Sequence, residues 1–379
     1  MKKTILGMAL MAAAIVPQTA SADKGNVHFK GQLVGLKDTL VVIIPTADNN
    51  VSHDTVFVKN GSFEFSVTVD KPKMIGAYTP ATLRRQENVG FQAIAVPGES
   101  AELSGDLASA YYFSGSKFYR EYNEADRAIE AAGKPFQSFM DSLDARKAAG
   151  ESREALRKEY KDKVPALRQQ ITDGILKFIK EHPSYEASAA IILQLDDLAK
   201  MNDAVNLLSP EVREGRMKSF YKPYIDNMMA QAQAEAEAAK KQAAGVEAPD
   251  FTLNDINGNP LTLSSLRGKY VVLDFWGSWC IWCIKGFPEM KKYYEKYKGK
   301  FEILGIDCND TQEKWKAAVE KHALPWLHVY YPRESTVLAD YAVQGFPTKI
   351  IVGPDGKIVK TVTGEDPSFY TLLDELFGE

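Results

Sequence analysis

Cysteine is scarce in this sequence. Only three of its 379 residues are cysteines, namely Cys280, Cys283 and Cys308. A fold held together by disulfides needs more of them, so a disulfide framework is excluded. A structural zinc site would need a second cysteine or histidine pair, and the five histidines form no such pair beside Cys308. We therefore expect no metal ion and no bound cofactor.

The sequence also lacks a long apolar run and an excess of positive charge. The apolar stretch at residues 5–16 is 12 residues long, whereas a membrane-spanning helix needs about 20. Lys and Arg number 46 against 50 Asp and Glu, which gives a net charge of −4. A chain of this charge is not attracted to a phosphate backbone, so nucleic-acid binding is not expected.

Residues 1–22 have the pattern of a secretory signal peptide. Two lysines come first, the apolar stretch follows, and the small residues 20–22 offer a cleavage site. We predict cleavage after Ala22 and export of a soluble chain. Cleavage removes two basic residues and no acidic one, which leaves 357 residues with a net charge of −6. A chain of that length exceeds one typical core, so two or three domains are expected.

The most informative motif is a pair of cysteines with two residues between them. Cys280 and Cys283 enclose Ile281 and Trp282 and follow the apolar run 271–275 closely. Free N–H groups at a helix start stabilise a thiolate, so Cys280 is the predicted nucleophile and Cys283 the predicted resolving cysteine. Neither residue between the cysteines is positively charged, which favours a disulfide reductase over a strong oxidant.

At this point the chain resembles a known family. The segment Asp274 to Cys283 is similar to the active-site segment of thioredoxins, and other motifs extend the resemblance over roughly residues 245–379. The combination resembles the TlpA/ResA-like thiol-disulfide oxidoreductases, which implies a thioredoxin-like α/β fold. The supporting motifs are Pro288, Gly345-Phe346-Pro347-Thr348, Ala248-Pro249-Asp250-Phe251-Thr252-Leu253 and Leu263-Ser264-Ser265-Leu266-Arg267-Gly268-Lys269.

Two positions depart from that family pattern. Trp282 stands where the family usually has proline, and Gly286 stands where the TlpA/ResA group usually has a glutamate. Asp274 occupies the place of the buried aspartate of ordinary thioredoxins, so one acid could replace the other. If Asp274 lies beneath the dithiol, burial raises its pKa and suits proton exchange with Cys283. The alternative is a solvated aspartate at a strand end.

The resemblance also suggests residues that contact a client protein. A cis Pro347 would present the backbone of Phe346 to an extended client segment. Trp279 and Trp282 are predicted to bind the client as well. Trp276 and Trp279 either form an apolar rim for docking or pack against the helix start, and the sequence does not decide between these. Cys308 is either a second redox thiol or an inert cysteine packed near a strand end.

The chain divides into regions of different pattern. Residues 23–115 alternate like strands and predict a small antiparallel β-sandwich or barrel, with a hairpin at Asn60-Gly61. This part resembles a domain of unknown function that precedes thioredoxin modules in exported proteins. Residues 116–244 predict helices and an exposed helical connector. For residues 245–379 we expect a hairpin, a strand 271–275, a helix from Cys280, a strand 302–307, a helix 313–322, strands 349–352 and 358–362, and a helix 369–376.

The leading functional hypothesis is a periplasmic enzyme that reduces disulfides in exported proteins. By resemblance, clients could include apocytochromes c, with a role in cytochrome c biogenesis, and electrons would come from a membrane thiol carrier of the DsbD/CcdA type. The first alternative is a disulfide oxidase or isomerase. A peroxidase is a second, but peroxiredoxins need a Pro-x-x-x-Thr/Ser-x-x-Cys loop and Trp276 and Gly277 stand there instead. In a third, the N-terminal regions form a client-binding or assembly module.

Overall fold

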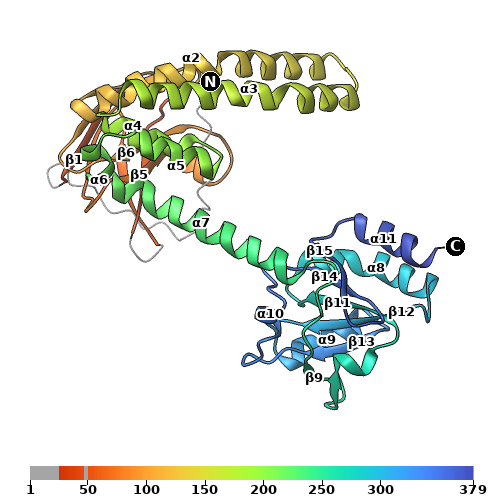
Figure 1. Ribbon diagram of the computed structural model, residues 1–379. Coiled ribbons are helices and arrows are strands. Elements are labelled where there is room, and N and C mark those ends of the chain that lie inside the picture. The colour runs from red at the N-terminus through yellow and green to blue at the C-terminus, as the bar shows by residue number, and fades with distance from the viewer. Residues whose placement is uncertain (1–24, 47–49, 379) are drawn as a thin grey trace. The chain divides into compact units, whose positions relative to one another are not determined.

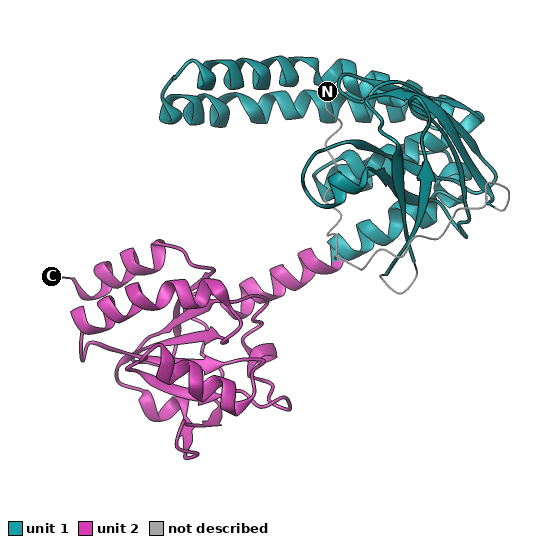
Figure 2. Cartoon of the chain, turned by 180° about the vertical axis from the view of Figure 1, so that it is seen from behind, with its two compact units in different colours: residues 1–229 teal, residues 230–379 magenta. Residues whose placement is uncertain are grey.

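The computed structural model describes residues 25–46 and 50–378. The predicted signal peptide, residues 1–22, lies outside them. The chain forms two compact units, residues 1–229 and 230–379 (Figure 2). Helix α7 (Lys218–Lys241) contains the boundary between them. Among the described residues, no helix has an apolar stretch long enough to span a bilayer.

The first unit contains two four-stranded sheets. One has the strand order β4-β1-β7-β8 and the other β3-β2-β5-β6, and both are open, as in a sandwich. All pairs are antiparallel except β1 with β7, which is parallel and departs from the expected antiparallel arrangement. The strands are β1 (Val27–Val34), β2 (Thr39–Pro45), β3 (Val51–Phe57), β4 (Ser62–Val67), β5 (Lys73–Tyr78), β6 (Gly90–Ala95), β7 (Ser100–Asp106) and β8 (Tyr111–Gly115), with a short helix α1 (Pro80–Leu83) after β5.

The turn predicted at Asn60-Gly61 is present, but the hairpin predicted around it is not. A tight turn forms there, because both residues have positive φ (53° and 77°) and Lys59 and Ser62 exchange backbone hydrogen bonds of 2.9 Å. The strands on either side do not pair in one sheet, however, since β3 pairs with β2 and β4 pairs with β1. Turn residues specify a local reversal, whereas the partner of each strand depends on distant residues that bury its apolar face.

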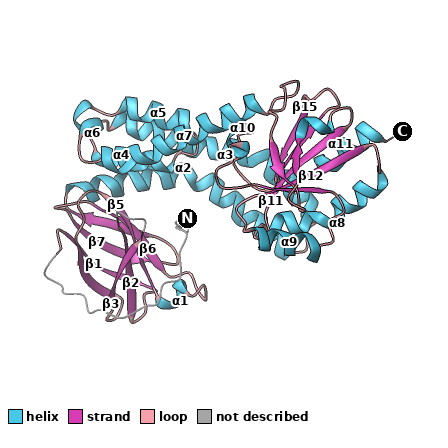
Figure 3. Cartoon of the chain, turned by 90° about the horizontal axis from the view of Figure 1, so that it is seen from below, coloured by secondary structure: helices cyan, strands magenta, loops and turns pink. Residues whose placement is uncertain are grey.

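Helices complete the first unit. The long helices α2 (Lys117–Ala148) and α3 (Arg153–Glu181) run side by side (Figure 1), and α2 also contacts β8. Figure 3 shows this helical part beside the strands. Ser209 caps helix α6 (Pro210–Glu214), because its side chain accepts a hydrogen bond from the Val212 N–H. The remaining elements are α4 (Glu186–Ala190), the 3-10 turn η1 (Ile191–Gln194), α5 (Leu198–Leu207) and α6 (Pro210–Glu214).

The second unit is thioredoxin-like, as the resemblance implied. Its five-stranded sheet has the order β13-β12-β11-β14-β15, parallel from β13 to β11 and antiparallel from β11 to β15. The expected strands and helices occur within one residue of their predicted bounds, but β13 was not predicted. The elements are β9 (Thr252–Asn254), β10 (Pro260–Thr262), η2 (Leu263–Leu266), β11 (Tyr270–Trp276), α8 (Ile281–Lys296), β12 (Phe301–Asp307), α9 (Gln312–Lys321), β13 (Leu327–Tyr330), α10 (Val337–Asp340), β14 (Thr348–Val352), β15 (Ile358–Thr363) and α11 (Ser368–Phe377).

The two faces of this sheet bury different cores. Val272 and Trp276 of β11 share one apolar cluster with α8, α9 and α11. Val271, Leu273 and Phe275, which alternate with them, share another with β9, η2 and α10. The central strand β11 is therefore buried on both faces, and its end leads directly to the two cysteines.

Candidate active site

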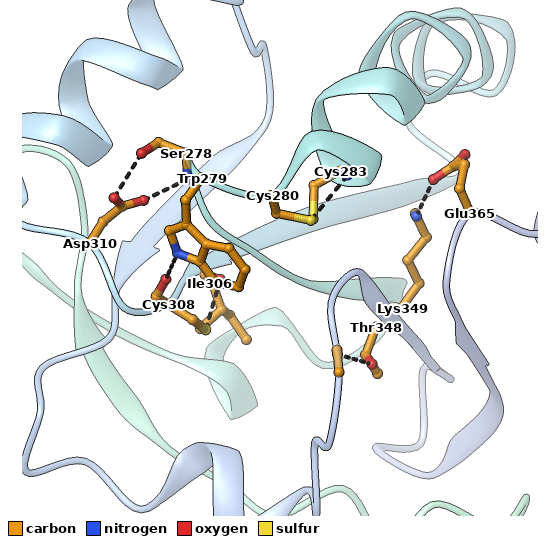
Figure 4. Close-up of a disulfide and its surroundings, with 11 residues drawn as sticks. Ser278, Trp279, Cys280, Cys283, Ile306, Cys308, Asp310, Thr348, Lys349 and Glu365 are labelled. Atoms are coloured by element: carbon orange, nitrogen blue, oxygen red, sulfur yellow. Dashed lines mark hydrogen bonds and ion pairs between the residues drawn. A yellow bond between two sulfur atoms is a disulfide. The ribbon is translucent and has the colours of Figure 1, made fainter. Parts of the chain in front are cut away.

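The two cysteines lie where strand β11 gives way to helix α8. Cys280 is the N-cap of α8, and its Sγ accepts a hydrogen bond from the Cys283 N–H at 3.2 Å. The two are joined by a disulfide with an S–S distance of 2.03 Å (Figure 4). Both cysteines are largely buried, and Cys280 is more exposed than Cys283. The attacking cysteine predicted from sequence thus lies at the helix N-terminus, where the dipole and free N–H groups stabilise its thiolate.

The loop before Cys280 is anchored by hydrogen bonds that the sequence did not reveal. The backbone N–H and the hydroxyl of Ser278 donate to the two carboxylate oxygens of Asp310, at 2.6 and 2.7 Å. The Trp279 indole N–H donates to the Cys308 carbonyl at 3.0 Å. A side chain at Gly277 would collide with that indole and that carbonyl, with contacts of 2.5 and 2.8 Å. Glycine is therefore required for the loop to lie so close to strand β12.

Asp274 is buried on the same face of the sheet as the dithiol. It alternates with Val272 and Trp276, which pack in the same cluster as Cys280 and Cys283. Its carboxyl has no hydrogen-bond partner among the described residues. Burial raises the pKa of Asp274 from 3.8 to about 6, an effect that Lys349 opposes and Glu365 reinforces. The carboxyl thus has the burial and the raised pKa that proton exchange with Cys283 requires.

An ion pair between a buried lysine and a partly exposed glutamate lies beside Asp274 and was not foreseen. Lys349 is directly opposite Asp274 in the β11/β14 pair, and its Nζ lies 2.9 Å from Glu365 Oε2 (Figure 4). The Tyr370 hydroxyl donates to Glu365 Oε1 at 2.8 Å. The only signal in the sequence is a lysine directly before the apolar residues 350–352 of β14, because Glu365 is 16 residues further along the chain and follows β15 in a loop.

An exposed apolar surface lies around the disulfide. Trp279, Ile281 and Trp282 are 52%, 62% and 58% exposed, although large apolar side chains are usually buried. Trp279 packs edge-on against the half-buried Phe346 at a ring distance of 5.3 Å. Lys285 Nζ lies 4.5 Å from the centre of the Trp282 ring. The predicted contact residues Trp279, Trp282 and Phe346 therefore present side-chain surface to solvent, and Ile281 adds to it.

The structure decides between the alternatives that the sequence left open for Pro347 and Trp276. The Phe346–Pro347 peptide bond is cis, as the resemblance implied, and Pro347 is buried. Trp276 cannot belong to a docking rim, because it is fully buried and packs edge-on against Phe287 at 5.3 Å. The rim interpretation was wrong for Trp276 because an aromatic residue at the end of a central strand fills the core before it can reach the surface.

Two buried groups lie at the carboxyl end of β12. The Cys308 thiol donates a hydrogen bond to the Ile306 carbonyl at 3.4 Å, and burial raises its pKa. A thiol in that state is protonated and shielded, which supports the packing role over a redox role. Burial and the neighbouring Asp310 raise the pKa of Asp307 to about 9. No group of three or more potential metal ligands occurs in the ranges 25–46 and 50–378.

The chain is similar to known proteins over its C-terminal third. Residues 244–361 match the AhpC/TSA family. "Thiol-disulfide oxidoreductase ResA" from Bacillus cereus (strain ZK / E33L) is 36% identical over 127 residues, which are 33% of this chain and 73% of that protein. The protein of the same name from Bacillus subtilis (strain 168) is 36% identical over 121 residues, which are 32% of this chain and 67% of that protein. A solved thioredoxin domain of a thiol-disulfide oxidoreductase from Bacteroides vulgatus is 34% identical, with a TM-score of 0.34 over 36% of this chain and 99% of that domain.

Proposed function

The chain belongs to the TlpA/ResA-like thiol-disulfide oxidoreductases of the thioredoxin superfamily, and we propose that it reduces disulfides of exported client proteins in the periplasm. The observation that carries this proposal is the Cys280–Cys283 pair at the start of α8, on the same face of the sheet as a buried acid with a raised pKa. The exposed aromatic side chains next to it offer a surface on which a partly unfolded client can dock.

The reaction begins with the pair in its dithiol form. The Cys280 thiolate attacks one sulfur of a client disulfide, forms a mixed disulfide, and displaces the other client sulfur as a thiolate that takes up a proton. Cys283 then gives its proton to the Asp274 carboxylate and attacks the Cys280 sulfur. The second client thiolate leaves and is protonated, and the Cys280–Cys283 disulfide forms. Two electrons have passed from the protein to the client.

The oxidised pair must be reduced again before another client can react. Two electrons and two protons are needed, and we propose that a membrane thiol carrier of the DsbD/CcdA type supplies them. The proposal includes apocytochromes c among the clients, because their cysteines must be reduced before haem attachment. Export through cleavage after Ala22 would bring the protein and these partners into one compartment.

The experiment that tests this function is a measurement of the reduction potential of the Cys280–Cys283 pair. The protein is equilibrated in dithiothreitol or glutathione buffers and followed by Trp279 fluorescence. A potential near or below about −270 mV, that of thioredoxin, supports a reductase. A potential near about −120 mV, that of DsbA, would instead make the protein a disulfide donor.

A turnover assay completes the test. Wild-type protein supplied with a thiol donor should reduce the disulfides of a model protein such as insulin. Cys280→Ser and Cys283→Ser should abolish turnover, while Cys308→Ala should retain it and serves as the matched cysteine control. The same preparation is tested for consumption of hydrogen peroxide, and rapid consumption without insulin reduction would favour a peroxidase over the proposed function.

A further inference from the structure

A lysine is buried in the central sheet next to the proposed proton carrier. Lys349 lies on β14, and its side chain is only 2% exposed. It is directly opposite Asp274, and residues opposite each other in an antiparallel pair project from the same face. An ammonium group in such a position needs a charged partner to offset its lost hydration. The hydrogen-bond partner of the ammonium is Glu365 and not Asp274, whose carboxylate oxygens accept no hydrogen bond from any described residue.

Glu365 reaches this site from the loop between β15 and α11. Its Oε2 accepts a hydrogen bond from Lys349 Nζ at 2.9 Å, and its Oε1 accepts one from the Tyr370 hydroxyl at 2.8 Å. The Tyr370 hydroxyl also lies 3.4 Å from the Gly286 carbonyl. These contacts hold the carboxylate against helix α8, and its side chain is 21% exposed to solvent.

The helix makes room for this carboxylate at Gly286. A Cβ atom added there would lie 2.3 Å from Glu365 Oε2 and 2.6 Å from its Cδ, so no larger residue fits beside the present position of Glu365. Gly286 is three residues after Cys283, and residues three apart lie on one side of a helix. The Glu365 carboxylate therefore occupies the space that a side chain one turn beyond the resolving cysteine would fill.

The charges around Asp274 come from several elements. Lys349 of β14 favours its ionised form, and Glu365 of the following loop disfavours it. Tyr370 of α11 and Cys308 after β12 are also coupled electrostatically to Asp274, and both are protonated because their own pKa values are raised. Cys283 of α8 shares the apolar cluster on this face. The effective charges are thus one ammonium, which is paired with the Glu365 carboxylate, and the Asp274 carboxyl group opposite it on the neighbouring strand.

We propose that Glu365, acting through Lys349, is a positioning residue that controls how readily Asp274 exchanges a proton with Cys283. Glu365 holds the ammonium away from a hydrogen bond with Asp274 and partly neutralises it. Asp274 is then a stronger base than it would be with Lys349 alone, so it can accept the Cys283 proton when the mixed disulfide is resolved. The inference rests on the proposed function, because it concerns the second step of that reaction.

The test follows the two steps separately with a small aromatic disulfide, 5,5′-dithiobis(2-nitrobenzoate). Attack by Cys280 of the reduced protein releases one coloured thiolate, and resolution by Cys283 releases the second. The rate of the second release is measured from pH 4.5 to 9 in wild type, Glu365→Gln, Lys349→Met and the double variant. Glu375→Gln, which alters an exposed acid of helix α11, is the matched control for a change of net charge.

Opposite shifts are expected for the two single variants. Loss of the Glu365 charge leaves Lys349 free to stabilise the Asp274 carboxylate. The midpoint of the pH dependence of the second release rate should therefore fall by about half a pH unit or more. Loss of the Lys349 charge should raise the midpoint by a similar amount, and the double variant should lie between the single variants. Glu375→Gln should match wild type. Lys349→Arg should restore the wild-type midpoint.

Unchanged midpoints, or shifts of the same sign, in folded single variants would overturn the inference. If Lys349→Met does not fold, Glu365→Gln and Lys349→Arg still decide the outcome, because only the first should move the midpoint. Failure of the proposed function looks different, since the wild type would then release both thiolates but not reduce insulin. The shifts in the second release would remain measurable in that case.

Discussion

Asp274 and Lys349 lie opposite each other on adjacent antiparallel strands, both almost fully buried, yet no hydrogen bond joins their side chains. The ammonium instead points to Glu365, at 2.9 Å. Asp274 is therefore left as a carboxyl whose ionisation costs free energy in the folded protein. In the proposed reaction, the same group therefore affects both the stability of the protein and its reactivity toward disulfides.

Replacement of Asp274 by asparagine should stabilise the protein at neutral pH. Burial raises the pKa of Asp274 from 3.8 to about 6, so the folded state binds more protons than the unfolded state between those values. The free energy of unfolding of wild type should fall as pH rises through this window, by up to about 3 kcal/mol. In Asp274→Asn this loss of stability should be absent. Urea unfolding of both proteins at pH 4, 6 and 8 measures the difference.

A control for this prediction is Glu237→Gln, which alters an exposed acid of α7. Its stability should follow the wild-type dependence on pH. Equal losses of stability in wild type and Asp274→Asn between pH 4 and 7 would contradict the assignment of a raised pKa to Asp274.

Replacement of Gly286 by alanine should disturb the reaction more than the fold. Alanine favours a helix interior over glycine by about 1 kcal/mol, so α8 itself should not be weakened. The new methyl group would displace the Glu365 carboxylate, which lies 2.3 Å from its position. We expect the midpoint of the second thiolate release to fall, as in Glu365→Gln. In the combined variant the two changes should not add, because both remove the same carboxylate, and an additive shift would refute this explanation.

Removal of the Asp310 carboxylate should loosen the loop before the dithiol. Asp310→Ala deletes both hydrogen bonds from Ser278. Each is worth about 1 kcal/mol net, and bonds to a charged group are stronger, so the free energy of unfolding should fall by about 1–3 kcal/mol. Thermal unfolding of oxidised and reduced protein measures this, with Glu320→Gln of α9 as an exposed control. A variant as stable as wild type would show that the loop does not depend on this anchor.

Substitution of the exposed apolar residues should affect protein clients but not small disulfides. Ile281→Ser and Trp282→Ser remove side chains that are 62% and 58% exposed. Buried aromatic contacts often dominate protein binding, so KM for insulin should rise roughly fivefold or more. The rate with 5,5′-dithiobis(2-nitrobenzoate) should stay within about twofold, because it needs no such surface. Phe57→Ser, at a 74% exposed position in the other compact unit, is the control.

Sequence reasoning located the reactive sulfurs and Asp274 because the information is local. The two cysteines are close in the chain, they follow an apolar strand, and alternation along that strand sets the face on which Asp274 lies. Lys349 and Glu365 were missed because 16 residues separate them and neither belongs to a motif. The same limit explains Asn60-Gly61, where local residues specify the turn but not the strand partners.

The contact between Gly286 and Glu365 also bears on how this enzyme can change over evolution. The helix can carry a larger residue at 286 only if the loop residue at 365 withdraws, and the loop can carry its acid only while the helix carries glycine. The identities at these two positions should therefore covary among homologous chains, with glycine on the helix accompanying an acid in the loop. A negative charge near the resolving cysteine can then be inherited from either of two segments, and a lineage can exchange one source for the other.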